Sequence, residues 1–352
     1  MHRCLQLAEM GFGHVSPNPM VGALLLYNER IIGEGYHKKY GEAHAEVNCF
    51  NSVLPDDKKL ISEATLYVSL EPCAHFGKTA PCADLIIKHK VSAVVIGCID
   101  SFAEVAGRGI EKLTAAGIDV TVGVLQKECR LLNRRFFTFH ENKRPYIILK
   151  WAQSRDGKMA ALDIAEEKYL KHPNSDRTII SNEFTNRLVH KWRSEEAAIL
   201  VGTNTALLDD PSLTTRHWPG RNPLRVVIDK NLKLPVNLKL FDEKEKTIVF
   251  NNIKQAEATN LLYYKLDANR NILTEITAAL YNMQVQSVIV EGGPRVLQSF
   301  IGEGLWDEAR VVTNTSMVLG KGLASPKINN EILIKEEKFA NDIFYIFLNF
   351  NN

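Results

Sequence analysis

The chain has 352 residues, of which 45% are hydrophobic and 24% charged, and its formal net charge is +2. This length predicts two domains, and a net charge so close to zero argues against a nucleic acid or an anionic membrane as partner. We expect a cytoplasmic protein, because no run of about 18 apolar residues predicts a membrane span, the first residues lack the apolar stretch of a secretory signal, and the six cysteines do not suit a disulfide framework in a chain this long.

The first 140 or so residues alternate predicted strands and helices. The pattern predicts strands over 20–27, 30–36, 64–70, 92–99 and 119–124, and helices over 43–53, 82–89, 110–116 and 127–139. The first two strands form a predicted hairpin. Strands separated by helices predict an α/β layered fold with a largely parallel sheet.

A polar segment that ends at Pro145 predicts a boundary between domains of residues 1–143 and 144–352. The second domain is also predicted to be α/β, with strands over 146–151, 197–201, 225–228, 247–250, 287–290, 310–313 and 343–348, and a helix over 296–301. The charged segment 165–176 is predicted to be a surface loop or a short exposed helix.

Three short stretches of the first domain carry metal-binding side chains, and they are His44-Ala45-Glu46, Pro72-Cys73 and Pro81-Cys82. One imidazole and two thiolates form a typical zinc set that leaves the fourth position for water. Each proline favours a helix start just after it, and a helix N-terminus favours thiolate over thiol. We therefore predict a zinc ion held by His44, Cys73 and Cys82. The pattern is typical of nucleobase deaminases, although eight residues rather than two separate the cysteines.

Two further residues of this domain suit work on a heterocycle. Glu46 is predicted to move protons beside the zinc, although it could also be a solvated first-turn glutamate that interacts with the helix dipole. Asn18, between two prolines, can donate to and accept from a ring edge, or it can be a plain turn residue. Spacing alone does not choose between these roles for Asn18.

The second domain lacks a Gly-x-Gly-x-x-Gly motif after a strand, which argues against a dinucleotide site of that type. The stretch 291–295 (EGGPR) lies between a predicted strand and a predicted helix, where glycines let backbone amides face an anion. It could equally be a plain connector. The predicted loop 202–211 carries hydroxyls, an amide and carboxylates that suit a ribose or a carboxamide, unless Thr203 or Asn204 only caps a helix.

Taken together, these stretches resemble the bifunctional deaminase–reductase family of riboflavin biosynthesis. In the first domain the resemblance rests on 16–22 (SPNPMVG), 44–46 and 71–82, whose cysteine spacing contains the insert His75-Phe76-Gly77-Lys78-Thr79. In the second domain it rests on 154–158, 191–195, 202–210, 213–216 and 291–294. It covers nearly the whole chain.

The resemblance implies a cytidine-deaminase-like α/β/α sandwich followed by a dihydrofolate-reductase-like α/β domain. It implies zinc-dependent hydrolytic deamination of 2,5-diamino-6-ribosylamino-4(3H)-pyrimidinone 5′-phosphate, and then NADPH-dependent reduction of the ribosyl group to a ribityl chain. Zn²⁺ and NADPH are the implied cofactors, and the substrate is a small pyrimidine ribosyl phosphate. We also expect a homo-oligomer.

The resemblance also implies roles for the residues that match its motifs. Glu46 would be catalytic, and His44, Cys73 and Cys82 would bind zinc. The implied substrate contacts are Asn18, His75, Lys78, Thr79, Arg177, Arg193, Leu213, Arg216 and Glu291. The implied NADPH contacts are Ala152, Ile179, Thr205, Asp209, Gly293, Pro294, Arg295, Val296 and Leu297. Asp209 is the nearest candidate for the proton donor of the reduction.

The chain departs from the family pattern at three places. Ala80 replaces the first proline of a usual Pro-Pro-Cys, which should have little effect. After Asp100, Ser101-Phe102-Ala103 replaces Pro-x-Pro, which predicts a different loop shape. Ile179 replaces a tryptophan that lines the cofactor, after a loop that is longer than usual, and this predicts weaker stacking on the cofactor.

Three alternatives remain open at this stage. The first is a nucleoside or nucleotide deaminase whose reductase-like domain has lost turnover, motivated by Ile179. The second is an RNA-binding or RNA-editing module, which the near-neutral charge disfavours. The third is a non-catalytic scaffold stabilised by zinc.

Overall fold

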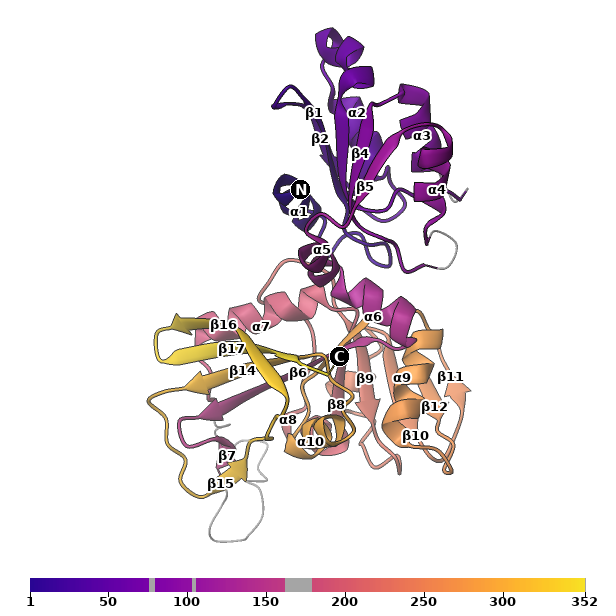
Figure 1. Cartoon of the computed structure of the whole chain (residues 1–352). Coiled ribbons are helices and arrows are strands. Elements are labelled where there is room, and N and C mark those ends of the chain that lie inside the picture. Colours follow the sequence, from indigo (N-terminus) through magenta and orange to yellow (C-terminus); the bar gives the residue numbers. More distant parts are fainter. Residues whose placement is uncertain (76–79, 103–105, 162–178, 352) are drawn as a thin grey trace. The chain divides into compact units, whose positions relative to one another are not determined.

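The computed structural model describes residues 1–75, 80–102, 106–161 and 179–351. The chain divides into two compact units, Met1–Lys143 and Arg144–Asn352 (Figure 1). Within the described residues, no helix combines the length and the apolar character that crossing a membrane requires.

Unit 1 is built on a five-stranded sheet in the order β2-β1-β3-β4-β5. The strands are β1 (Gly22–Tyr27), β2 (Arg30–Tyr36), β3 (Thr65–Leu70), β4 (Ala93–Cys98) and β5 (Asp119–Val122). β1 runs antiparallel to β2 and β3, whereas β3, β4 and β5 are parallel. The carboxyl ends of β3 and β4 therefore lie at the same edge of the sheet.

Helices cover both faces of this sheet. They are α1 (His2–Glu9), α2 (Ala45–Ser52), α3 (Cys82–His89), α4 (Arg108–Ala115), α5 (Gln126–Leu132) and α6 (Arg134–Asn142), with a 3₁₀ helix, η1 (Pro55–Glu63). Cys49 of α2, Ile86 of α3 and Leu113 of α4 pack into one core cluster. α1 and α5 contribute Ala8 and Cys129 to other clusters, and Figure 1 shows α1 on the side of the strands opposite α3 and α4. The result is an α/β/α sandwich.

The single helix predicted over 127–139 is wrong, because α5 and α6 separate at Asn133. The side chain of Asn133 is buried and accepts the Met20 backbone N–H at 2.8 Å, while its amide nitrogen donates to the Met20 carbonyl at 2.8 Å. Asn133 itself has φ −99° and ψ 23°, outside the helical range. A partner 113 residues away thus fixes this break, and local periodicity does not reveal it.

Unit 2 is built on a ten-stranded sheet in the order β11-β12-β10-β9-β8-β13-β6-β14-β17-β16. Its strands are β6 (Tyr146–Ser154), β8 (Ala198–Gly202), β9 (Leu224–Ile228), β10 (Thr247–Asn251), β11 (Ala256–Glu257), β12 (Leu261–Lys265), β13 (Ser287–Val290), β14 (Glu308–Asn314), β16 (Glu331–Phe339) and β17 (Asp342–Asn349). The strands from β12 to β14 in this order are parallel, and β11, β17 and β16 join antiparallel. β7 (Lys158–Ala161) and β15 (Gly322–Ala324) form a separate pair.

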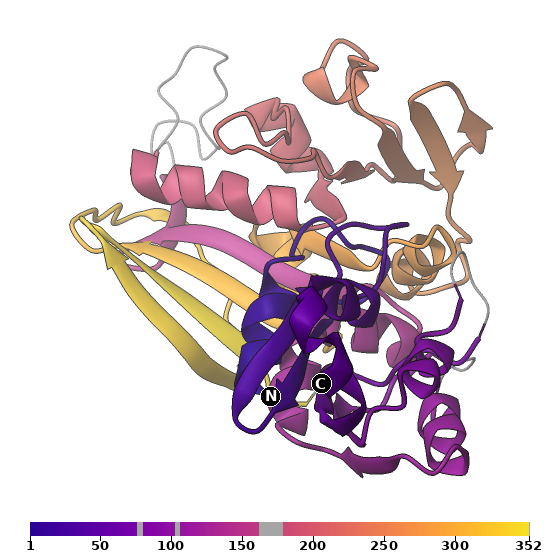
Figure 2. The same cartoon turned by 90° about the horizontal axis from the view of Figure 1, so that it is seen from above.

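The helices of unit 2 are α7 (Glu183–Glu195), α8 (Thr203–Asp209), α9 (Ile272–Asn282) and α10 (Pro294–Gly302), with a 3₁₀ helix, η2 (Lys239–Phe241). Trp192 of α7 packs with Ile148 of β6 in one core cluster, and α9 and α10 pack into another. Figures 1 and 2 show α7 lying along the strands, on the face opposite α10.

Seven strands predicted for this half coincide closely with β6, β8, β9, β10, β13, β14 and β17. The sequence analysis missed β7, β11, β12, β15 and β16. β16 is exposed along most of its length, so its sequence lacks the apolar alternation that marks a half-buried strand.

Replacing Asn133 by Ala should lower the free energy of unfolding by about 2–4 kcal/mol, because both backbone groups of Met20 lose buried hydrogen bonds. Urea unfolding followed by circular dichroism measures this change. Asn51→Ala, at an exposed position of α2, is the matched control and should change stability by less than about 0.5 kcal/mol. Equal effects of the two substitutions would contradict this account of the break.

Candidate functional site

The three predicted zinc ligands come from elements that meet near the carboxyl end of β3. His44 is the N-cap residue of α2, Cys82 is the first residue of α3, and Cys73 lies in the segment that follows β3. Because parallel strands and helix N-termini converge at this edge, residues far apart in the sequence reach the same place.

The donor atoms of these residues form a compact triangle. His44 Nδ1 lies 3.4 Å from Cys82 Sγ and 3.6 Å from Cys73 Sγ, and the three donors lie within 4.8 Å of one another. At usual zinc bond lengths and tetrahedral angles, a nitrogen and a sulfur ligand are about 3.6 Å apart. Both the donor types and their spacing therefore fit a zinc ion.

Local hydrogen bonds favour the thiolate of Cys73. The Cys82 backbone N–H donates to Cys73 Sγ at 3.3 Å. Hydrogen bonds from the Cys82 thiol and from His44 lower the pKa of Cys73. The predicted helix start after Pro81 is confirmed, since Pro81 is the N-cap of α3, but no helix begins in the described residues just after Pro72.

The carboxylate of Glu71 holds the segment that carries Cys73. It is buried and accepts backbone N–H groups from Gly107 at 3.0 Å and Gly109 at 2.9 Å, at the start of α4. A Cβ at Gly109 would lie only 2.1 Å from the Pro72 carbonyl oxygen. The beginning of α4 thus packs directly on the backbone next to Cys73, and only glycine fits there.

Glu46 lies in the first turn of α2, with a side chain that is 3% exposed. Burial, and then the nearby Cys73, raise the pKa of Glu46 to about 7. A carboxyl group that titrates near neutral pH can both accept and return a proton. The alternative of a solvated first-turn glutamate does not fit this burial.

His37 fixes the amide of Asn18, and the sequence analysis missed it. His37 Nδ1 lies 3.1 Å from the Ala43 carbonyl, which can only accept, so Nδ1 carries the proton. His37 Nε2 then accepts from Asn18 Nδ2 at 3.2 Å. Burial lowers the pKa of His37, which keeps the ring neutral. This arrangement leaves the Oδ1 of Asn18 for another donor.

The insert between the two cysteines is described only in part. His75 Nδ1 is buried and has no hydrogen bond among the described residues, and the His75 ring lies 6.1 Å from the ring of Phe102. Phe102 belongs to the loop that departs from the family pattern. Lys78, Thr79 and Ala103 lie outside the described residues.

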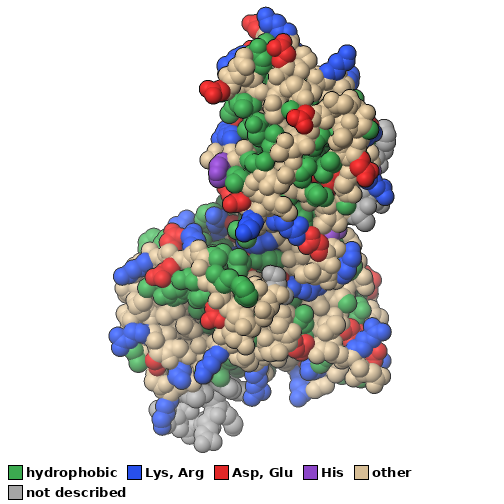
Figure 3. Space-filling view, viewed as in Figure 1, with side chains coloured by type: hydrophobic (Ala, Val, Ile, Leu, Met, Phe, Trp, Pro, Cys, Tyr) green, Lys and Arg blue, Asp and Glu red, His purple; other side chains and the backbone are tan. Residues whose placement is uncertain are grey.

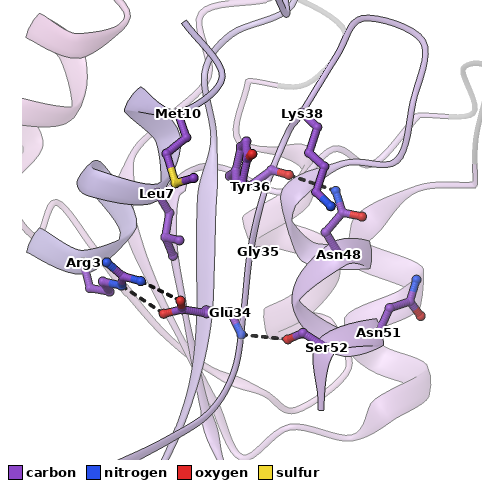
Figure 4. Close-up of a pocket in the computed structure, with 10 residues that line it drawn as sticks. All are labelled: Arg3, Leu7, Met10, Glu34, Gly35, Tyr36, Lys38, Asn48, Asn51 and Ser52. Atoms are coloured by element: carbon purple, nitrogen blue, oxygen red, sulfur yellow. Dashed lines mark hydrogen bonds and ion pairs between the residues drawn. The ribbon is translucent and has the colours of Figure 1, made fainter. Parts of the chain in front are cut away.

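A separate groove of about 440 Å³ runs along β2 and contains none of the predicted site residues (Figure 4). Two side chains of α2 line it and bond to the outer edge of this strand. Ser52 Oγ accepts the Glu34 backbone N–H at 2.9 Å, and Asn48 Nδ2 donates to the Tyr36 carbonyl at 2.8 Å. These side chains therefore occupy backbone groups that would otherwise pair with another strand.

In unit 2, two helices begin at the carboxyl ends of neighbouring parallel strands. α8 follows β8 with Gly202 as its N-cap, and α10 follows β13 with Gly293 as its N-cap. A Cβ at Gly202 would lie 2.7 Å from the Val296 side chain, and one at Gly292 would lie 3.0 Å from Val296 Cβ. Both glycines thus bring backbone close to the first turn of α10.

Most of residues 202–211, which were predicted to form a loop, form the helix α8 in the structure. Neither Thr203 nor Asn204 caps this helix through its side chain, and the Thr203 hydroxyl instead donates to the Ile228 carbonyl at 2.8 Å. Among the other predicted NADPH contacts, Thr205 and Asp209 lie in α8 and Ala152 lies in β6. Gly293, Pro294, Arg295, Val296 and Leu297 lie at the start of α10. Ile179 is 75% exposed.

Two of the predicted substrate contacts in unit 2 bind each other. Arg193 donates to Glu291 through Nε at 2.8 Å and Nη2 at 2.7 Å, and through Nη1 to the Thr214 carbonyl at 3.3 Å. Lys150 Nζ lies 3.9 Å from Glu291. Burial by itself would raise the pKa of Glu291, but Arg193 and Lys150 outweigh it and lower the pKa to about 2.

The guanidinium fork of Arg193 is therefore largely occupied by Glu291. Leu213 is buried with a φ of 55°, and Arg216 is exposed. Arg177 lies outside the described residues. The sequence analysis did not single out Lys150 as a neighbour of Glu291, although a lysine inside a predicted apolar strand is unusual enough to indicate a special role.

Comparison with known proteins assigns a family to each unit. Residues 1–98 match the cytidine and deoxycytidylate deaminase zinc-binding region, and residues 145–340 match the RibD C-terminal domain. The chain is 39% identical to the riboflavin biosynthesis protein RibD of Aquifex aeolicus, over 92% of this chain and 88% of that protein. It is 33% identical to RibD of Escherichia coli, over 88% of this chain and 84% of that protein.

A similar solved structure is that of a diaminohydroxyphosphoribosylaminopyrimidine deaminase/5-amino-6-(5-phosphoribosylamino)uracil reductase from Thermotoga maritima. It matches with a TM-score of 0.84 at 34% identity, and covers 99% of this chain and 97% of that chain. RibD of Acinetobacter baumannii matches with a TM-score of 0.82 at 27% identity, with the same coverage.

Replacing Glu291 by Gln should lower the free energy of unfolding at pH 7 by about 3 kcal/mol, because Arg193 loses its buried counter-ion. The lowered pKa of Glu291 means that its carboxylate stabilises the folded state above pH 4.5, and that this contribution is lost as the pH falls towards 2. Chemical unfolding at several pH values measures the difference between variant and parent. Glu303→Gln, at an exposed position, is the control. A difference that stays constant from pH 7 to pH 3 would contradict the ion pair as its source.

Proposed function

The chain belongs to the RibD family of riboflavin biosynthesis proteins, and from this premise we propose how its two units divide a deamination and a reduction. The predicted family, the two-part α/β fold and the bifunctional deaminase–reductase activity with zinc and NADPH as cofactors are confirmed. The assignment of residues to each step is our proposal.

Unit 1, residues 1–143, carries the deaminase step on a small pyrimidine ribosyl 5′-phosphate. His44, Cys73 and Cys82 hold zinc, which supplies the Lewis acidity that makes water a nucleophile at neutral pH. The carboxyl group of Glu46 accepts the proton of the attacking water and returns it to the amino nitrogen that leaves as ammonia. The triangle of donor atoms with the buried Glu46 on the same helix is the observation that carries this proposal.

Asn18 and the insert after Cys73 hold the substrate for this step. His37 donates to a backbone carbonyl and accepts from Asn18, so the Asn18 Oδ1 faces away from His37 as an acceptor for a ring N–H or amino group. His75, Lys78 and Thr79 bind the ring or the ribose phosphate. A basic insert suits an anionic substrate, because charge-assisted hydrogen bonds to phosphate are strong.

Unit 2, residues 144–352, carries the reductase step. The N-termini of α8 and α10 bind the diphosphate of NADPH, and Thr205, Asp209 and the stretch 293–297 line that site. NADPH supplies the hydride that reduces C1′ of the opened ribose to give the ribityl chain. Arg193, Leu213, Arg216 and Glu291 hold the ribosylaminouracil phosphate, with Arg193 fixing Glu291 in place. Asp209 is the proposed proton donor.

The predicted partners beyond the small substrate remain proposals. We propose a cytoplasmic homo-oligomer that binds neither nucleic acid nor a membrane. A reducing compartment protects thiolate ligands from oxidation to disulfides. On the face drawn in Figure 3, Lys and Arg side chains are mixed with Asp and Glu on both units, in keeping with the net charge of +2. Salt-dependent retention of RNA by the purified chain at physiological ionic strength would contradict this part.

Replacing Glu46 by Gln should slow ammonia release from the pyrimidine phosphate by at least about 10²-fold, because the proton shuttle is lost. Bound zinc, measured by elemental analysis, should be unchanged, since Glu46 is not a ligand. Glu42→Gln, at an exposed position two residues before His44, is the control. Ammonia release at the parental rate in Glu46→Gln would support the non-catalytic scaffold instead.

Incubating the zinc-loaded chain with the diamino pyrimidine ribosyl phosphate and NADPH should give a product whose mass reflects exchange of an amine for an oxo group plus two hydrogens. The Cys73→Ser variant should lose zinc and ammonia release but should still oxidise NADPH when given the already deaminated substrate. Mass spectrometry and absorbance at the NADPH band follow the two steps. Deamination without NADPH oxidation in the parent chain would favour the alternative of a silent reductase unit.

A further inference from the structure

α7 carries a buried histidine to which the reaction above gives no role. His190 lies three residues before Arg193, so the two side chains share one face of the helix. The His190 side chain is 1% exposed, and its Nδ1 has no hydrogen bond among the described residues. An unpaired buried polar atom costs about 1–3 kcal/mol, and such an atom in a native fold needs an explanation.

The surroundings of His190 are cationic. The ring of His217 meets the His190 ring edge-on at a centroid distance of 4.7 Å and an angle of 88°. Besides His217, three charged groups interact electrostatically with His190. They are Arg193 on the same helix, Arg216 next to His217 in the sequence, and Glu291 after β13. Glu291 already pairs with Arg193 at 2.7 Å, whereas no ion pair of Arg216 is found in the described part of the chain.

The segment that carries Arg216 is held against α7. Arg193 Nη1 donates to the Thr214 carbonyl at 3.3 Å. Asn222 Oδ1 accepts from both the backbone N–H and the hydroxyl of Thr215, each at 2.9 Å. These bonds fix the backbone just before the exposed Arg216, and the residue just after it, His217, contacts the His190 ring. A fixed segment that carries an arginine, beside a buried ring with an unpaired nitrogen, suits an anion.

We propose that His190 belongs to a phosphate subsite of unit 2, and that it is neutral without ligand and takes up a proton when a phosphate dianion lies against Arg216. This inference rests on the proposed reductase function, since the phosphate is that of the ribosyl substrate. The proton comes from solvent, and the protonated ring gains a second N–H donor.

The electrostatics set the direction of the effect. Burial first, and then Arg193 and Arg216, lower the pKa of His190 to about 4, so the free protein holds a neutral ring at neutral pH. A bound dianion offsets these cations and raises the pKa of His190. The affinity for phosphate therefore increases as the pH falls through the raised pKa that His190 has in the complex. The increase is lost as the pH rises through that pKa.

The test is calorimetry on the full zinc-loaded chain with NADP⁺, which cannot donate a hydride. The deaminated ribosyl phosphate, its dephosphorylated form and inorganic phosphate are titrated at pH 6.5 in two buffers of different ionisation enthalpy. The parent chain should take up protons with both phosphate-bearing ligands but not with the dephosphorylated one. In His190→Gln, the proton uptake beyond that of the phosphate ligand itself should be lost. The same variant should raise KM for the phosphorylated substrate about tenfold, with a smaller change in kcat.

Two further measurements keep the outcomes separate. His217→Gln should retain the uptake, and loss of the uptake in that variant but not in His190→Gln would overturn the proposal. Equal uptake by the parent chain with phosphorylated and dephosphorylated ligand would overturn it without any variant, so it does not depend on whether His190→Gln folds. Failure of the parent chain to oxidise NADPH with the deaminated substrate would instead contradict the reductase function, while inorganic phosphate still tests the subsite.

Discussion

The convergence of one imidazole nitrogen and two sulfurs depends on where the chain turns at the end of β3. There the backbone N–H groups at the start of α4 bind the carboxylate of Glu71, and Gly109 packs on the carbonyl of Pro72. This contact fixes the residue next to Cys73, while the first turns of α2 and α3 bring His44 and Cys82 to it. Because Glu46 lies two residues after His44, in the first turn of α2, the geometry that gathers the donors also places this proposed proton shuttle.

The two units use a common device for different chemistry. In both, helices begin at the carboxyl ends of parallel strands, where backbone N–H groups and the helix dipole favour negative charge. Unit 1 uses this field to favour a thiolate at Cys73, next to the first residue of α3. Unit 2 has glycines as the N-caps of α8 and α10, where we propose that backbone amides bind the diphosphate of NADPH. One arrangement of strand and helix thus lies beside a metal ligand in one unit and at the proposed diphosphate site in the other.

Local patterns predicted most strands and the helices around the zinc ligands, since apolar alternation and proline positions act within a few residues. Where a prediction from the sequence was wrong or incomplete, a contact between residues far apart in the sequence determines the structure. Asn133 breaks the predicted helix because it binds Met20, 113 residues away. His37 acquires its role only when it lies next to Asn18 in the fold. Residue types predicted the chemistry of the site, but the contacts that orient its side chains can be seen only in the folded structure. The roles of the individual residues stay predictions.

X-ray absorption at the zinc edge of the purified, active chain tests the central claim most directly, because it reads ligand types and distances without a substrate. The account predicts one zinc per chain with two sulfur neighbours at about 2.3 Å and two lighter neighbours, one of them an imidazole nitrogen, at about 2.0 Å. Active material without zinc, or a spectrum with no sulfur neighbour, would contradict it.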